Sequence, residues 1–147
     1  MQPLAVPHEV LDVHSKLKDA GFEAYLVGGC VRDILLGRTP KDWDITTNAS
    51  PEEIQPLYEE TFYENQYGTV GVVTQSENPR LKVIEITPYR TEGEYTNARH
   101  PDQVAWSDKL SDDLKRRDFT INAIAYDPTT NTLIDEHNGA GDLERKV

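Results

Sequence analysis

The sequence predicts an α+β domain in which a small mixed β-sheet has helices on one side. Helical and strand patterns follow each other along the chain without the regular strand–helix–strand order of parallel α/β folds. The length of 147 residues fits a single domain with one core. Apolar residues make up 37% and charged residues 28%, which is typical of a globular chain.

The first part of the chain predicts helices and strands on either side of paired glycines. Val10, Val13 and Leu17 share one face of a helix over residues 9–20. The segments that follow are a strand at 24–27, a turn at Gly28–Gly29, a helix at 31–36 and a strand at 43–46. Ser50, Pro51 and Glu53 form a capping-box pattern, which predicts a helix from residue 51 to about residue 60.

The second part predicts two hairpins separated by a loop and a helix. Residues 69–74 and 81–87 are β-branched and apolar, and the polar segment between them suits a hairpin turn. Residues 90–104 are polar with little periodicity and predict a long mobile loop. The remaining predictions are a helix over residues 107–118 and a second hairpin formed by residues 124–126 and 132–134.

The net charge excludes one way of binding nucleic acid. Lys and Arg number 15 against 26 Asp and Glu, which gives a formal charge of −11. A domain that bound nucleic acid through its overall field would be basic. This chain therefore either binds no nucleic acid or acts at one local site, and its acidity suits divalent cations where carboxylates converge.

Cysteine and histidine patterns offer no metal cage. The one cysteine, Cys30, excludes an internal disulfide and a cysteine zinc site, and we expect it to pack behind the glycine turn. The four histidines lack ligand spacing. No apolar run approaches the ~18 residues of a membrane span, and the N-terminus has no signal-peptide pattern. These features predict a cytoplasmic protein.

Three acidic residues on predicted strands are candidate ligands for Mg²⁺. Asp42 and Asp44 alternate on the strand, which would place them on one face, whereas Trp43 and Ile45 would point into the core. Glu85 lies between isoleucines on another strand and becomes a third ligand if the two strands pair. Such carboxylates can hold the pair of Mg²⁺ ions used in nucleotidyl transfer. The alternatives are that the two aspartates are solvated at a strand end and that Glu85 faces solvent from the middle of its strand.

Two further segments could contact phosphates. Gly28 and Gly29 lie between a strand and a helix, where backbone N–H groups can approach an anion, and Arg32 follows within one turn. Arg116 and Arg117 are adjacent arginines in a very acidic chain. The alternatives are a plain tight turn for the first segment and a solvated helix face for the second.

Together these segments resemble the bacterial-type (class II) CCA-adding tRNA nucleotidyltransferases and their poly(A) polymerase relatives. The glycine turn with Arg32, followed by Asp42-Trp43-Asp44, resembles the first motif of that family. The strand around Glu85 is similar to its third-carboxylate strand, and residues 116–123 match its RRDFTINA motif. The resemblance runs from about residue 20 to the end of the chain.

The resemblance implies a DNA polymerase β-like catalytic head and assigns roles to individual residues. Asp42, Asp44 and Glu85 would be catalytic and bind Mg²⁺. The nucleotide-binding residues would be Gly28, Gly29, Arg32, Arg117, Asp118 and Asn122. A flexible loop that helps to switch between adding C and adding A would include Arg90, Tyr95, Arg99 and His100. The implied reaction is attack of a tRNA 3′-hydroxyl on CTP or ATP with release of pyrophosphate.

One departure from the family affects the expected partners. In the family, a neck that reads the base edge and further helical domains that hold tRNA follow the head, whereas this chain ends just before that neck. We therefore expect residues 1–147 to be the head alone, with neck, body and tail domains absent. The chain would then be a truncated chain, a fragment, or half of a split enzyme with a partner subunit. Rival functions are a poly(A) polymerase head, a nucleotidyltransferase that acts on another acceptor, and a module without turnover.

Overall fold

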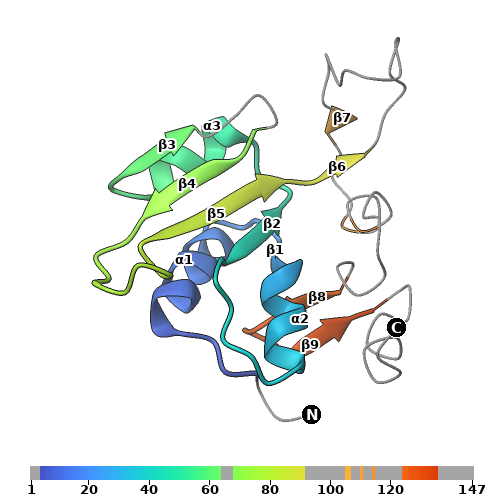
Figure 1. The fold of residues 1–147 in the computed structure, drawn as a ribbon. Helices are drawn as coiled ribbons and strands as arrows, with labels where there is room; N and C mark the ends of the chain where they lie inside the picture. Colours follow the sequence, from blue (N-terminus) through green and yellow to red (C-terminus); the bar gives the residue numbers. More distant parts are fainter. Residues whose placement is uncertain are drawn as a thin grey trace, which may run out of the picture.

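The structure is a computed structural model of the chain, and it describes residues 4–63, 68–91, 105–106, 110, 114 and 124–135. Within these residues a seven-stranded sheet has the order β3-β4-β5-β2-β1-β8-β9 (Figure 1). Its strands are β1 (Ala24–Val27), β2 (Asp44–Thr47), β3 (Thr61–Tyr63), β4 (Val70–Val73), β5 (Val83–Pro88), β8 (Ala125–Asp127) and β9 (Thr132–Ile134). The β2–β5 pair is parallel, and the other pairs of this sheet are antiparallel. The predicted mixed sheet is therefore confirmed.

Helices α1 (His8–Asp19), α2 (Gly29–Leu35) and α3 (Pro51–Ile54) pack on one face of this sheet. Val10 and Val13 of α1, and Val31 of α2, are buried in the same cluster as Leu26 and Ile45 of the central strands. All of these strand residues point to one face because side chains alternate along a strand. The prediction of helices on one side is confirmed for these three helices (Figure 1).

The opposite face of the sheet is partly covered as well. Val27 of β1 and Ala125 of β8 are buried against Leu114, with Leu110 and Ile134 packed beside them. Leu110 and Leu114 both have helical backbone conformation, and their side chains pack against this face of the sheet. These are the described residues of the predicted 107–118 helix, and they cover the β1–β8–β9 side of this face.

Two sequence predictions needed correction here. The capping box of Ser50 and Glu53 forms, but α3 ends at Ile54 and a 3₁₀ turn, Gln55–Leu57, follows. Pro56 has no backbone N–H for a helical hydrogen bond, and its ring obstructs the preceding turn, which explains the early end. Strand β3 was not predicted, because its three residues are partly or fully exposed and show no alternation of apolar and polar side chains.

A short strand pair flanks the predicted 90–104 loop. Strands β6 (Arg90–Thr91) and β7 (Ala105–Trp106) pair antiparallel, so the loop prediction was wrong for Arg90 and Thr91, which form a strand, whereas β7 follows directly after the predicted loop. In Figure 1, β6 follows the C-terminal end of β5 and extends beyond the main sheet. Tyr95, Arg99 and His100 lie outside the described residues.

No helix in the described segments has the length and apolar character needed to cross a membrane.

A buried histidine, not singled out by the sequence, ties α1 to the sheet. His14 is 1% exposed and donates from Nε2 to the carbonyl oxygen of Ala24 at 2.8 Å. The Asp127 carboxylate lies 3.5 Å from the same nitrogen and 3.4 Å from Lys18 Nζ. Burial lowers the pKa of His14 below its ordinary 6.5, because the favourable contacts with Ala24 and Asp127 offset only part of the cost of desolvating a charged ring.

Acid should therefore destabilise the fold through His14. The unfolded chain takes up the proton first, so the contribution of neutral His14 is fully present above about pH 6.5 and is lost as pH falls below it. We expect the free energy of unfolding to fall less between about pH 7.5 and about pH 5.5 in His14→Gln than in the wild type. Urea unfolding at both pH values measures this, with the exposed His8→Gln as the control. Equal pH dependence in His14→Gln and wild type would contradict the assignment.

Candidate active site

The parallel pairing of β2 and β5 places two acidic residues side by side. Asp44 and Glu85 are Cα partners in this register. Directly paired residues of adjacent strands point to the same face, so both carboxylates lie on the face opposite the helices. Both side chains are half-buried, whereas their neighbours Ile45, Ile84 and Ile86 are fully buried in the core. The structure thus puts Glu85 beside Asp44, and not across the sheet from it.

Asp42 is placed differently from the sequence prediction. Strand β2 begins at Asp44, so Asp42 precedes the strand and is exposed instead of alternating along it. Trp43 is buried, as predicted, and its carbonyl oxygen accepts a hydrogen bond from the backbone N–H of Glu85 at 3.1 Å. This bond holds β5 in register up to the residue that separates the two aspartates.

A cavity of about 400 Å³ joins the aspartates to the glycine turn. Its lining includes Gly29, Arg32, Asp42 and Asp44. The remaining residues of the lining are Cys30, Asp33, Arg38, Thr39 and Lys41. The structure therefore brings together several candidate residues from two motifs that the sequence identified separately. Glu85 is not part of this lining and joins the group through its pairing with Asp44.

Two positively charged residues that line this cavity were not identified from the sequence. Arg38 and Lys41 belong to the segment that connects α2 to β2, and both are exposed. Their position between the glycine turn and Asp42 was the available signal, because a short connection must pass close to both motifs.

The backbone conformation at position 28 requires a glycine. Its φ of 76° and ψ of −145° lie in a region that is almost exclusive to glycine. This conformation turns the chain from β1 directly into α2, where the backbone N–H of Arg32 bonds to the carbonyl oxygen of Gly28 at 3.2 Å. The tight turn keeps residue 29 next to the end of β1, which pairs with Asp44 through Val27.

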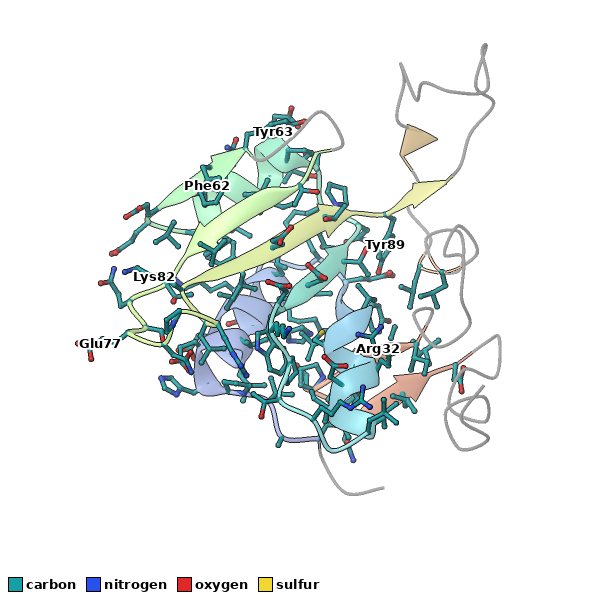
Figure 2. All side chains as sticks on the ribbon, viewed as in Figure 1. Arg32, Phe62, Tyr63, Glu77, Lys82 and Tyr89 are labelled. Atoms are coloured by element: carbon teal, nitrogen blue, oxygen red, sulfur yellow. The ribbon has the colours of Figure 1, made fainter. Side chains whose placement is uncertain are left out.

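The Arg32 side chain folds back along α2 towards this turn. A Cβ atom built on Gly29 would lie 3.2 Å from Nη2 of Arg32, so the guanidinium lies against the glycine. Asp33 accepts a hydrogen bond from Nε of Arg32 at 3.2 Å, which orients the guanidinium plane. Arg32 is one-third exposed at the cavity, where it can pair with an anion (Figure 2).

The acidic residues could hold a magnesium ion together with oxygens of a substrate. Within the described segments, no three Asp, Glu, His or Cys side chains converge into a closed metal cage. Magnesium in nucleotide enzymes is usually held by one or two carboxylates together with substrate phosphates and water. Asp44 and Glu85, with Asp42 at the edge of the cavity, supply such an open set of oxygen donors.

Three predicted nucleotide-binding residues, Arg117, Asp118 and Asn122, lie outside the described residues, so the structure does not place them.

Comparison with known proteins places the chain in a family. Residues 24–147 match the poly A polymerase head domain family. The chain belongs to this family. The head domain is also 46% identical over 140 residues to the CCA-adding enzyme of Streptococcus mutans and 41% identical over 140 residues to that of Geobacillus stearothermophilus. Each match covers 95% of this chain and 33% of the relative, so the head domain spans about a third of the length of these enzymes.

Solved structures support the same assignment. The CCA-adding enzyme of Bacillus stearothermophilus in complex with CTP superposes with a TM-score of 0.80 at 39% identity, over 94% of this chain and 31% of that chain. A tRNA nucleotidyltransferase with a primer tRNA and an incoming ATP analogue gives a TM-score of 0.66 at 32% identity, over 90% of this chain and 36% of that one. The fold of the described residues is thus that of a nucleotidyltransferase head.

Cys30 supports the turn of the head domain from beneath. Its side chain is 1% exposed and Sγ donates to the carbonyl oxygen of Val27 at 3.2 Å. Burial raises the pKa of the Cys30 thiol to about 12, since a thiolate would lose its hydration there. The expected packing behind the turn is confirmed.

Cys30 should therefore resist thiol reagents in the native chain. At about pH 8 the thiol is protonated and covered, and the thiolate is the reactive form. We expect an aromatic disulfide reagent to label the native protein far more slowly than the urea-unfolded protein, as followed by absorbance. Equally fast labelling in both states would contradict the burial of this side chain.

Proposed function

We propose that this chain is the catalytic head of a tRNA nucleotidyltransferase that adds C and A to the tRNA 3′ end from CTP and ATP and releases pyrophosphate. The observation that carries the proposal is the in-register pair Asp44–Glu85 beside a cavity lined by Gly29 and Arg32. Family membership and the relatives described above support it: several are CCA-adding enzymes, one seen with CTP.

We assign the carboxylates to metal binding. Asp42, Asp44 and Glu85 would hold Mg²⁺, which in this chemistry activates the attacking hydroxyl and neutralises charge on the leaving group. The half-buried Asp44 and Glu85 are fixed by strand pairing, so they need little reorganisation to present their oxygens. Asp42, exposed at the edge of the cavity, can move towards an arriving ligand.

The triphosphate would lie on the α2 side of these acids. Backbone N–H groups at the Gly28–Gly29 turn can approach phosphate oxygens closely because neither residue has a side chain. Arg32 offers a planar fork for two phosphate oxygens, and Arg38 and Lys41 add positive charge around the same cavity. From the family resemblance we also assign Arg117, Asp118 and Asn122 to the nucleotide.

Selection of the base and binding of the tRNA would depend on regions that the longer relatives have. The chain spans about a third of those relatives, and its net charge of −11 is unsuited to holding a polyanion over a large surface. We propose that residues 1–147 act as the catalytic head, in the cytoplasm, in cooperation with such regions or with a partner subunit.

The nearest alternative function is a poly(A) polymerase head, which the family match also accommodates. Product length separates the two: a CCA-adding enzyme extends tRNA by a few nucleotides, whereas a polyadenylating enzyme makes long tails on generic RNA. A nucleotidyltransferase for another acceptor would instead label a non-RNA substrate.

Removing one carboxylate should weaken metal-dependent nucleotide binding. We expect Asp44→Asn and Glu85→Gln each to reduce the affinity for CTP in the presence of Mg²⁺ by about tenfold or more, because a ligand to the ion is lost. Isothermal titration with and without Mg²⁺ measures this. The control is Glu77→Gln, an exposed side chain in the β4–β5 connection. Unchanged affinity in both active-site variants would contradict the proposal.

The isolated chain should bind CTP and ATP with Mg²⁺ weakly and without preference. The described cavity is lined by groups that can contact phosphates, including Gly29, Arg32 and Lys41, and CTP and ATP share the same triphosphate. Competition between the two nucleotides measures the ratio of their dissociation constants. A preference of more than about tenfold, or ordered CCA addition to tRNA by this chain alone, would contradict this prediction.

A further inference from the structure

An exposed aromatic ring lies on the face of the sheet that carries Asp44 and Glu85. Neither the sequence motifs nor the proposed function involves this ring. Phe62 is on the edge strand β3 and is 41% exposed (Figure 2). It pairs with Gly71 of β4. A Cβ atom built on Gly71 would lie 2.4 Å from Cζ of Phe62, so the ring lies directly over the glycine.

The register of the sheet puts this ring in one row with the two acids. Gly71 pairs with Glu85, and Glu85 pairs with Asp44. Directly paired residues share a face, so the space above Gly71, which the Phe62 ring occupies, is on the same face as both carboxylates. Neighbouring strands are about 4.8 Å apart, which places Gly71 about 10 Å from Asp44 across the sheet.

The ring and the phosphate-directed groups lie on opposite sides of the acids. The glycine turn and Arg32 follow β1, which is next to β2 on one side, whereas Phe62 lies beyond β5 and β4 on the other side. In an in-line phosphoryl transfer, the attacking hydroxyl and the leaving group are on opposite sides of the phosphorus. If pyrophosphate leaves towards α2, the acceptor hydroxyl approaches from the β4–β3 side.

We propose that Phe62 is a stacking platform for the last base of the acceptor RNA strand. This inference rests on the proposed function and adds a contact for the acceptor that comes from the head itself. An aromatic face binds any base by stacking, a contact to the base that does not itself depend on positive charge, so a chain of net charge −11 can make it. The gap left by Gly71 lets the ring lie flat against the sheet, and the residue remains 41% exposed.

A purely structural role for Phe62 is the competing explanation. An aromatic residue opposite a glycine can stabilise a strand pair by covering the exposed backbone. That role requires an apolar group over Gly71 but no aromatic face. Leucine and methionine can cover the glycine without offering a flat π-surface, so substitution separates the two roles.

The experiment measures binding of a short single-stranded oligoribonucleotide with 2-aminopurine as its 3′-terminal base, in the presence of Mg²⁺ and CTP. We expect the fluorescence to change on titration with the wild-type chain, because the probe reports stacking. Phe62→Leu should bind about fivefold more weakly or worse, and Phe62→Trp should retain binding. Tyr63→Leu is the matched control, since Tyr63 is the exposed aromatic neighbour that alternates to the other face of β3.

A second comparison needs no protein variant. The same oligonucleotide with an abasic 3′-terminal residue, carrying its fluorophore at the 5′ end, should bind the wild type about fivefold more weakly or worse than its intact counterpart. This difference should vanish in Phe62→Leu, or in Phe62→Met if the leucine variant does not fold. Equal affinity of the wild type for both oligonucleotides, or a loss in Tyr63→Leu equal to that in Phe62→Leu, would overturn the proposal.

Failure of this inference is distinguishable from failure of the proposed function. Binding of CTP with Mg²⁺ should be the same in Phe62→Leu and the wild type, because Phe62 is on the other side of the acids from the phosphate-directed groups. A wild-type chain that binds CTP but leaves the 2-aminopurine signal unchanged at saturating protein overturns the platform alone. A chain that does not bind CTP with Mg²⁺ contradicts the proposed function itself.

Discussion

The parallel pairing of β2 with β5 is the constraint on which the candidate active site depends. It sets Asp44 opposite Glu85, although the two residues are 41 positions apart in the sequence. A slip of one residue would turn Glu85 into the core and expose Ile84 and Ile86, both fully buried. Burying one isoleucine is worth about 1.5–3 kcal/mol, so the hydrophobic core enforces the register of the acids. The stability of the fold and the proposed chemistry therefore both depend on the alternation of buried isoleucines with Glu85 along β5.

The two faces of the sheet have different roles: one buries the main hydrophobic core, and the other carries the acidic residues. Helices α1 to α3 cover one face completely enough to bury a core around Leu26 and Ile45. On the other face, Leu114 covers the β1–β8 side, and the acids lie in the neighbouring row. Under the proposed function, apolar packing beside the acids would limit access of water and strengthen their interaction with a cation. The row from Asp44 through Glu85 and Gly71 to Phe62 lies on this second face.

Local signals in the sequence predicted most elements that carry the site, because each has its own pattern. The glycine turn at Gly28, the capping box at Ser50 and both hairpins formed as expected. The position of Asp42 outside β2 was not predictable, since a strand boundary depends on pairing with β5 and not on local propensity. The same holds for Phe62 over Gly71, and for His14 beside Asp127, where the partners come from distant segments. Contacts of this kind depend on tertiary structure, so a local sequence pattern does not predict them.

The central claim is that Asp44 and Glu85 together bind the divalent ion of a nucleotide complex. The most direct measurement is the anomalous scattering of Mn²⁺ in crystals of the chain grown with Mn²⁺ and a non-hydrolysable CTP analogue. We predict a peak within ligand distance of both carboxylates, with the triphosphate extending from it towards Arg32. Nucleotide bound without a metal peak at these residues, or a metal site elsewhere on this acidic surface, would contradict the account.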